Sequence, residues 1–298
     1  MNILITGGTG FIGDELRTLL LKKGHDLVIV TRNPKEYEDE NARNQRFIAW
    51  DDDLVATVNN VDAVINLAGE NIFAWRWTPE KKERILNSRI RVTTRLVEAM
   101  VEADNKPKVF ISASGASIYG DRGDEVLSES EAASDDFLAS VCVKWESESQ
   151  KASELGIRVV NPRIGVVLEE GGGALEKMIP PFQFFVGGPI GSGDQYMSWI
   201  HRTDLCRSFI FALENEQVKG AYNACSPNPV TMGEFSEILG AVMNRPAIFK
   251  VPEFAINLVM GEVAKTVTDS IRMQPKNLQV NGFDFHFEEL EEALADIV

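Results

Sequence analysis

The residues best suited to do chemistry in this sequence are glycines that directly follow a short apolar run near the start of the chain. Residues 2–6 are mostly apolar, Gly7, Gly10 and Gly13 come next, and a leucine stripe at helical spacing follows. Strand, glycine turn and helix in this order place backbone N–H groups at the positive end of a helix, where a diphosphate binds. The spacing predicts a dinucleotide-binding βαβ unit, because side chains at these glycines would hold the phosphates away from the backbone.

The end of the second expected strand indicates which dinucleotide binds. Sites for NAD usually carry Asp or Glu at this position, where the carboxylate binds the ribose 2′-hydroxyl. Here Thr31 and Arg32 occupy the position instead. A guanidinium suits a 2′-phosphate by its charge and its paired donors, so we expect NADP as the cofactor, with NADPH preferred over NADH. The alternative is that Arg32 is a solvated charge at a strand end.

Further apolar runs alternate with amphipathic helices along the first half of the chain. The expected strands and helices span residues 2–6, 11–23, 27–30, 46–50, 63–67, 79–103, 108–114, 137–154 and 157–167. Such alternation predicts an α/β fold, in which helices cover both faces of a doubly wound parallel sheet. Ligands of such sheets gather at the carboxyl ends of the strands, so the motifs at those ends are expected to share one crevice.

The composition changes after about residue 168, where glycine, proline and aromatic residues become frequent. We expect this part to form a smaller C-terminal α+β cap lobe over the crevice. The predicted division is a dinucleotide-binding Rossmann lobe at 1–168, to which 201–226 returns, and a substrate or cap lobe at 169–200 and 227–298.

The overall composition excludes several kinds of partner. The chain has 298 residues and a formal net charge of -15 with no basic stripe, so a nucleic acid is not expected to bind. Cys142, Cys206 and Cys225 form no C-x-x-C pair and the three histidines lie far apart, so we expect no metal site. The apolar runs are too short to cross a membrane, and an apolar strand directly after Met1 leaves no room for a signal peptide. We therefore expect a cytoplasmic protein.

The assembled motifs resemble those of the short-chain dehydrogenase/reductase superfamily, extended type. They are TGGTGFIG (6–13), NLAGE (66–70), ISASGASIYG (111–120), RVVNPRIGVVL (158–168) and WIHRTDL (199–205). More narrowly, the chain resembles an atypical branch described as NAD(P)-dependent epimerase family proteins. The branch motifs are NLAGENIFAWRWT (66–78), KWE (144–146), GGGAL (171–175), GGPIGSG (187–193) and PKNLQVNGFDFHFEELEEAL (275–294). The resemblance covers essentially the whole chain and implies the fold and the dinucleotide site, but no particular reaction.

The resemblance also implies a catalytic set of a Ser or Thr, a Tyr, and a Lys one helical turn after the Tyr. In the superfamily the Tyr exchanges a proton with a substrate oxygen, while the Lys lowers the pKa of the Tyr and binds the nicotinamide ribose. The helix expected to carry this pair contains DFLASVCVKWESESQ (136–150) and has no tyrosine. The usual proton donor is therefore missing, and the helix could serve packing alone.

Two alignments of this helix stay open. If Lys144 is the family lysine, the tyrosine position is Ser140, and a lysine is kept without an adequate acid. If Glu146 is the glutamate that commonly follows the lysine, the pair becomes Leu138 and Cys142, and neither family residue is kept.

The remaining site candidates lie at strand ends and in the branch motifs. We expect Ser114, or alternatively Ser117, to polarise a substrate oxygen, and Lys144 to contact the nicotinamide ribose. Tyr119 is expected to line the pocket and could replace the missing acid. The expected substrate contacts are Glu70, Arg76, Trp77 and Tyr119. The expected cofactor contacts are Gly7, Gly10, Phe11, Ile12, Gly13, Thr31, Arg32, Asp51, Leu67, Ala68, Gly69, Lys144 and Arg163.

These features predict an NADP(H)-binding oxidoreductase or epimerase that acts on a small carbonyl or sugar-like substrate. The alternative is a sensor or regulatory protein that holds NADP without turnover, which the missing Tyr-x-x-x-Lys favours. A hydrolase with Cys142 as nucleophile has no histidine or acid motif in its support. A homodimer is a possible assembly, because helices 80–103 and 137–154 resemble those that form dimers in relatives.

Overall fold

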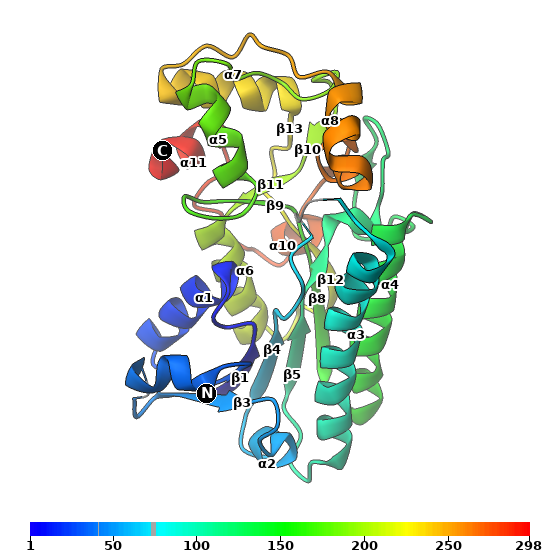
Figure 1. Ribbon diagram of the computed structural model, residues 1–298. Helices are drawn as coiled ribbons and strands as arrows, with labels where there is room; N and C mark the ends of the chain where they lie inside the picture. The colour runs from blue at the N-terminus through cyan, green and yellow to red at the C-terminus, as the bar shows by residue number, and fades with distance from the viewer. Residues whose placement is uncertain (41, 73–75) are drawn as a thin grey trace.

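A parallel β-sheet forms the centre of the larger lobe of the computed structural model, which describes residues 1–40, 42–72 and 76–298 (Figure 1). In spatial order its strands are β12 (Gly220–Ala224), β8 (Arg158–Ile164), β5 (Val109–Ser112), β4 (Ala63–Asn66), β1 (Asn2–Thr6), β2 (Asp26–Thr31) and β3 (Gln45–Ala49), with β6 (Ser114–Gly115) also paired to β8. The strand order reverses between β1 and β4, which is the place where doubly wound sheets bind ligands. The predicted doubly wound parallel sheet is confirmed.

Helices cover both faces of this sheet because each face consists of buried aliphatic side chains. On one face lie α1 (Phe11–Lys22) and α6 (Arg202–Glu214), and on the other lie α2 (Leu54–Val58), α3 (Pro79–Glu102) and α4 (Phe137–Gln150). Among the described residues, short 3-10 segments complete the connections: η1 (Pro34–Glu40), η2 (Ala116–Ile118), η3 (Lys151–Leu155) and η4 (Gly261–Ala264). Alternate residues of one strand serve the two layers: Ile3 and Ile5 pack on the α1 side, and Leu4 packs on the α3 side.

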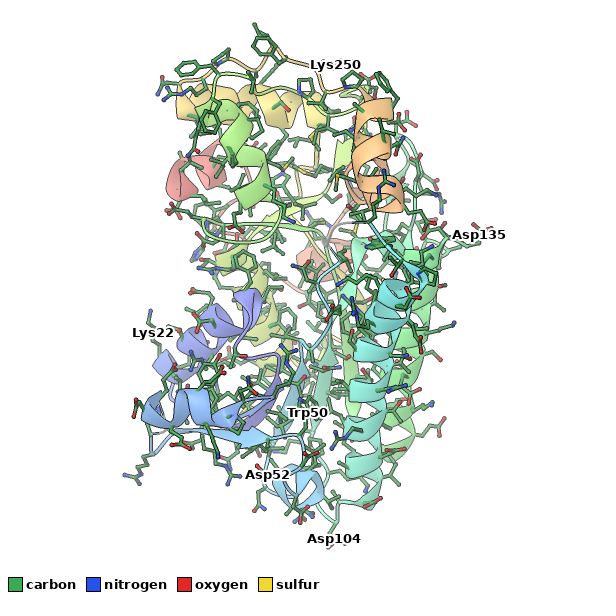
Figure 2. All side chains as sticks on the ribbon, in the orientation of Figure 1. Lys22, Trp50, Asp52, Asp104, Asp135 and Lys250 are labelled. Atoms are coloured by element: carbon green, nitrogen blue, oxygen red, sulfur yellow. The ribbon has the colours of Figure 1, made fainter. Side chains whose placement is uncertain are left out.

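The cap lobe lies over the carboxyl ends of the strands (Figure 1). It contains α5 (Leu175–Gln183), α7 (Met232–Met243), α8 (Glu253–Met260), α9 (Lys265–Thr268), α11 (Leu290–Ile297) and the pair β10 (Tyr196–Met197) and β13 (Val230–Thr231). Its apolar side chains form a cluster of their own around Trp199, Phe235 and Leu294. Figure 2 marks the two ends of the molecule by Lys250 on the cap and Asp104 below the sheet.

In the described part of the chain, pairs of short strands and one short helix lie where the two lobes meet. They are β9 (Val166–Leu168) with β11 (Trp199–His201), β7 (Val126–Leu127) with β14 (Arg272–Met273), and α10 (Lys276–Val280), which packs beside β12. The strand expected at 157–167 is interrupted at Gly165, where a Cβ would lie 2.5 Å from the Ser198 carbonyl oxygen. Because α6 and β12 return to the sheet, the packing supports the division of the chain at residues 168, 200 and 226, which stays a proposal.

A buried polar network fixes the end of β4 below the candidate site. The side-chain oxygen of Asn66 accepts a hydrogen bond from Thr6 at 2.7 Å, and its amide nitrogen donates to Thr93 at 3.0 Å and Ser112 at 3.1 Å. Trp145 donates its indole N–H to the same Thr93 oxygen at 3.0 Å. One asparagine thus ties β1, β4 and β5 to α3, and through α3 to α4.

Substitution of Asn66 should therefore destabilise the larger lobe. Asn66→Ala leaves the buried hydroxyl groups of Thr6 and Ser112 without their partner and removes one donor from Thr93, and we expect it to lower the free energy of unfolding by about 2–4 kcal/mol. Urea unfolding followed by circular dichroism measures this, with the exposed Asn60→Ala as the control, expected within about 0.5 kcal/mol of the parent. An Asn66→Ala protein as stable as the control would contradict this account of the network.

Candidate cofactor and substrate site

Two connected cavities lie at the carboxyl ends of β1, β4 and β5. The glycine-turn cavity, of about 490 Å³, is bounded by the β1–α1 turn, the segment after β4 and the start of α5. The central cavity, of about 320 Å³, lies between η2, one face of α4 and the segment 164–167. Residues that line both are Phe11, Ile12, Ile72, Arg89, Ser114, Trp145, Ile164 and Gly173. Together they form one elongated space that leads from the glycine turn toward α4.

The glycine turn packs so closely that only glycine fits at its two ends. Gly7 has a φ of +71°, and a Cβ there would lie 2.8 Å from the Leu67 carbonyl carbon. A Cβ on Gly13 would lie 2.2 Å from the carbonyl oxygen of Gly7. The first turn of α1 therefore opens onto the cavity with no side-chain cap at Gly10, its N-cap residue. Free N–H groups at a helix N-terminus beside a cavity fit a diphosphate.

The strands β2 and β3 follow β1 in the sheet, and the predicted cofactor residues at their ends line neither of the two cavities. Thr31 ends β2 and is buried, and Arg32 after it is exposed. Asp51 follows the end of β3 and is also exposed. Trp50, marked in Figure 2, packs against α3, where the guanidinium of Arg95 lies 5.2 Å from its ring centre. Arg32 is within electrostatic reach of Glu70, whose pKa it helps to lower.

The geometry favours one of the two alignments of α4. Leu138, Cys142 and Trp145 line the central cavity at helical spacing, which favours Leu138 and Cys142 as the positions of the missing pair. Asp136 starts the helix by accepting a hydrogen bond from the Ala139 N–H at 2.9 Å, which sets this face. Lys144 lies on the exposed face, so its predicted contact with the nicotinamide ribose has no support in the geometry.

A buried ion pair behind the central cavity orients Ser114. Arg163 donates to Glu146 through two nitrogens, at 2.9 and 3.0 Å. The Ser114 hydroxyl donates to the same carboxylate at 2.7 Å. Burial alone would lower the pKa of Arg163, but its hydrogen bonds to Glu146 raise that pKa above the ordinary value. Ser114 is therefore an acceptor on its cavity side, whereas Arg163, predicted to contact the cofactor, lies behind the wall.

Tyr119 is part of the core and not of the cavity wall. It is fully buried, donates its hydroxyl hydrogen to Asn223 at 2.7 Å and accepts a hydrogen bond from Arg163 at 2.9 Å. Burial raises the pKa of its phenol to about 12. The two roles predicted for Tyr119, substrate contact and proton donor, therefore have no support in the structure.

Cys142 lines the cavity as a neutral thiol. Burial raises its pKa to about 11, and Arg89 offsets this only in part. A thiol in this state is a poor nucleophile at neutral pH. The geometry does not favour a hydrolase.

The three predicted substrate residues after β4 separate in the structure. Glu70 lines the glycine-turn cavity, where Lys81 at 2.6 Å lowers its pKa by a hydrogen bond. Arg76 donates to the Leu258 carbonyl oxygen and so ties this segment to α8. Trp77 packs edge-on against Phe137, at 5.6 Å between ring centres, and lines a different cavity. Residues 73–75 of the same motif lie outside the described residues.

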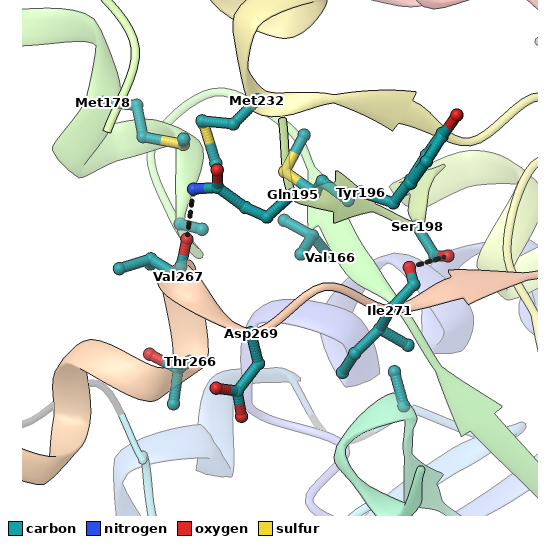
Figure 3. Close-up of a pocket in the computed structure, with 13 residues that line it drawn as sticks. Val166, Met178, Gln195, Tyr196, Ser198, Met232, Thr266, Val267, Asp269 and Ile271 are labelled. Atoms are coloured by element: carbon teal, nitrogen blue, oxygen red, sulfur yellow. Dashed lines mark hydrogen bonds between the residues drawn. The ribbon is translucent and has the colours of Figure 1, made fainter. Parts of the chain in front are cut away.

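This different cavity, the side cavity, has a volume of about 290 Å³ and shares Ser117, Leu138, Thr266 and Ile271 with the central cavity. Asp269 lines it, together with a small cavity between β10 and α9 that contains three methionines. In Figure 3 the Asp269 carboxyl group points away from Met178 and Met232. Burial, and next the charge of Asp121, raise the pKa of Asp269 to about 6.

Two residues of the site were not predicted as site residues. Glu146 served only as an alignment marker, because a sequence does not show that a helix glutamate is buried against an arginine. Arg89 lies on α3, four residues after Ile85 and four before Thr93, both buried. An arginine within a buried helical stripe is the signal that could have found it.

Comparison with known proteins agrees with this geometry. Residues 3–225 match the model of the NAD dependent epimerase/dehydratase family, and residues 251–297 match a domain of unknown function, DUF1731. The chain belongs to the NAD dependent epimerase/dehydratase family. It is 39% identical to "Epimerase family protein YfhF" of Bacillus subtilis over 100% of this chain and 98% of that protein. The predicted resemblance to this family is confirmed.

Two solved structures of the family are informative. The human epimerase family protein SDR39U1 (isoform 2), solved with NADPH, is 34% identical and superposes with a TM-score of 0.90, over 100% of this chain and 99% of that chain. A nucleoside-diphosphate sugar epimerase from Corynebacterium glutamicum is 32% identical, with a TM-score of 0.79, over 99% of this chain and 57% of that chain. The extended dehydrogenase-like fold is thus shared along the whole chain, and the family is one that binds NAD(P).

The described part of the chain holds neither a metal-binding cluster nor a membrane-spanning helix. No cluster of three or more His, Cys, Asp or Glu side chains in it is arranged to hold a metal ion. No helix there is both long enough and apolar enough to cross a membrane.

The raised pKa of Asp269 predicts a pH-dependent effect on stability. Because the folded protein holds this proton more tightly than the unfolded chain, the stabilisation is present below about pH 4 and is lost as the pH rises through about 6. Asp269→Asn should therefore raise the free energy of unfolding at pH 8 by about 1–2 kcal/mol, a value reduced for solvent screening, and change little at pH 4.

Urea unfolding of parent and variant at both pH values measures this difference. The charged groups that act on Asp269 are Asp121, Lys265, Asp136 and Glu253. A stabilisation of the same size at both pH values would show that the change comes from packing and not from the carboxyl proton.

Proposed function

We propose that the chain is an NADPH-dependent oxidoreductase or epimerase that acts on a small carbonyl or sugar-like substrate. One observation carries the proposal: the glycine-turn cavity, shaped for a diphosphate, continues without a break into a second chamber beside Ser114. A dinucleotide bound at the turn would extend its second base into this chamber. The names of two similar proteins agree, one solved with NADPH and one described as a nucleoside-diphosphate sugar epimerase.

The residues that would hold the cofactor fit it in shape and charge. The backbone at Gly10 and Ile12 faces the diphosphate position, and Leu67 and Gly69 line the space beside it. Arg32 offers a positive charge at the end of β2, where a 2′-phosphate would lie and where no carboxylate stands. Phe11, against which Gly172 packs, closes the turn from the cap side.

The substrate would lie in the central cavity and the adjoining side cavity. The bound cofactor would exchange a hydride with the substrate there: NADPH would give one to a substrate carbonyl, and NADP⁺ would take one from a carbon that bears a hydroxyl group. Because the Ser114 hydrogen bonds to Glu146, the Ser114 oxygen accepts a hydrogen bond from a substrate hydroxyl and does not donate one to a carbonyl. This polarity favours a hydroxyl-bearing, sugar-like molecule over a simple ketone.

A second candidate function is a sensor that holds NADPH without turnover. A specific observation favours it: Leu138 and Cys142 occupy the positions from which a proton donor and its lysine would face the cavity. Neither a leucine nor a thiol with a pKa of about 11 is an efficient proton donor at neutral pH.

Cofactor preference is the first test. NADPH should bind at least about ten times more tightly than NADH, because a charge-assisted pair with the 2′-phosphate is worth about 1.5–3 kcal/mol. Arg32→Ala should remove this preference by weakening NADPH alone, as measured by titration calorimetry. Arg46→Ala is a matched control, since Arg46 is an exposed arginine on the neighbouring strand. Equal affinity of the parent for both cofactors would contradict the NADP assignment.

Turnover is the second test and separates the two functions. NADPH oxidation is followed with a panel of aldehydes and ketones, and NADP⁺ reduction and sugar epimerisation are followed with a panel of nucleotide sugars. We expect turnover to be fastest with hydroxyl-bearing members of the panel, and to fall in Ser114→Ala. Tight NADPH binding with no turnover on any member would instead favour the sensor.

Location and assembly stay predictions. A cytoplasmic protein and a homodimer through the surfaces of α3 and α4 are still expected from the sequence. Sedimentation velocity of the purified chain tests the assembly.

A further inference from the structure

Arg89 brings a positive charge into the space shared by the glycine-turn and central cavities. It comes from α3, one helix turn after Ile85, and it lines both cavities. Its guanidinium lies close to Gly69, where a Cβ would be 3.0 Å from the guanidinium carbon. Trp145 also contacts it, with 5.1 Å between the guanidinium carbon and the ring centre. The group is therefore held in a fixed slot at the cavity wall.

The partners of this cation are neutral. One terminal nitrogen donates to the carbonyl oxygens of Glu70 at 3.1 Å and Ile85 at 3.0 Å. In the described part of the chain, no carboxylate oxygen lies within ion-pair distance of Arg89, and the nearby Glu70 carboxylate is paired with Lys81. Burial lowers the pKa of Arg89. A half-buried cation without a counter-ion is costly for the protein, so its position at a cavity indicates a ligand that carries negative charge or oxygen lone pairs.

The position of Arg89 along the two cavities indicates which part of the ligand it would contact. The adenine half of a dinucleotide would lie near Arg32 and Asp51, and the diphosphate at the glycine turn. Arg89 stands beyond the turn, where the two cavities overlap and where Ser114 also lies. Between the diphosphate and the second base a dinucleotide has only a ribose, so the groups within reach of Arg89 are that ribose and the phosphate joined to it.

We propose that Arg89 binds the phosphate and ribose oxygens of the nicotinamide half of the cofactor. This assignment rests on the proposed function. Arg89 acts on Cys142 through its charge, so the cation stands next to the α4 position that carries a thiol. Helix α3 thus supplies a positive charge that α4 lacks on its cavity face. The arginine positions the second nucleotide and takes no part in proton transfer.

A comparison of two ligands tests whether Arg89 contacts the nicotinamide half of the cofactor or the adenine half. NADPH contains both halves, and adenosine 2′,5′-bisphosphate contains only the adenine half with its 2′-phosphate. By titration calorimetry on the full chain, Arg89→Gln should weaken NADPH by about ten-fold or more and leave the bisphosphate within about two-fold of the parent, because one charge-assisted contact is lost. Arg32→Ala should weaken both ligands.

Two further variants control for the fold. Arg89→Lys keeps the charge and should retain part of the NADPH affinity, whereas Arg91→Gln removes one exposed charge two residues along the same helix and should change neither ligand. Thermal unfolding of each variant shows whether the fold is intact.

The outcomes distinguish this assignment from the proposed function. NADPH affinity that is unchanged in Arg89→Gln overturns the assignment alone, as does an equal loss for both ligands. An Arg89→Lys protein that binds NADPH no better than Arg89→Gln also overturns it, because charge would then not matter. A parent protein that binds neither ligand contradicts the proposed function, and the assignment with it.

Discussion

The contact between the glycine turn and the end of β4 is the constraint on which the site depends. A Cβ on Gly7 would lie 2.8 Å from the Leu67 carbonyl carbon after β4, and a Cβ on Gly13 would lie 2.2 Å from the Gly7 carbonyl oxygen within the turn. This packing brings the N-terminus of α1, the start of the segment after β4 and the carboxyl end of β1 to one place. The free N–H groups of α1 then face a cavity instead of a side chain. The other residues of the candidate site lie around this edge of the sheet.

A layer of buried polar groups holds the walls of the site. Asn66 connects three strands to α3, and the pair of Glu146 and Arg163 connects α4 to β8. Buried ion pairs seldom add net stability, because desolvation offsets the attraction between the charges. Here the pair orients a hydroxyl group. Glu146 accepts the hydrogen bond of the Ser114 hydroxyl, so the Ser114 oxygen faces the cavity as an acceptor. The hydrogen-bonding polarity of Ser114 thus depends on a carboxylate that lies behind the cavity wall.

The sequence predicts the carboxyl-end edge of the sheet better than it predicts the cavity wall formed by α3 and α4. Glycine spacing and strand ends have a direct structural meaning, so the turn, the position of Arg32 at a strand end and the doubly wound sheet could be predicted from them, whereas the cofactor role of Arg32 stays a prediction. The direction of a single side chain on α4 could not, because Lys144 and Cys142 are two residues apart and either could face inward. Tyr119 lies in a motif at a strand end, but its burial depends on Asn223 and Arg163, which are distant in sequence. Arg89 resembles an ordinary charged helix residue until Gly69 and Trp145 are placed around it.

The central claim is that one NADPH molecule lies across this edge of the sheet, from Arg32 past the glycine turn to Arg89 and Ser114. The most direct measurement is a crystal structure of the chain grown with NADPH. We predict electron density for the diphosphate at the N-terminus of α1 and for the nicotinamide ring in the central cavity between Ser114 and Cys142. Density for the cofactor at another surface, or a nicotinamide ring outside this cavity with Arg89 free of contact, would contradict the account.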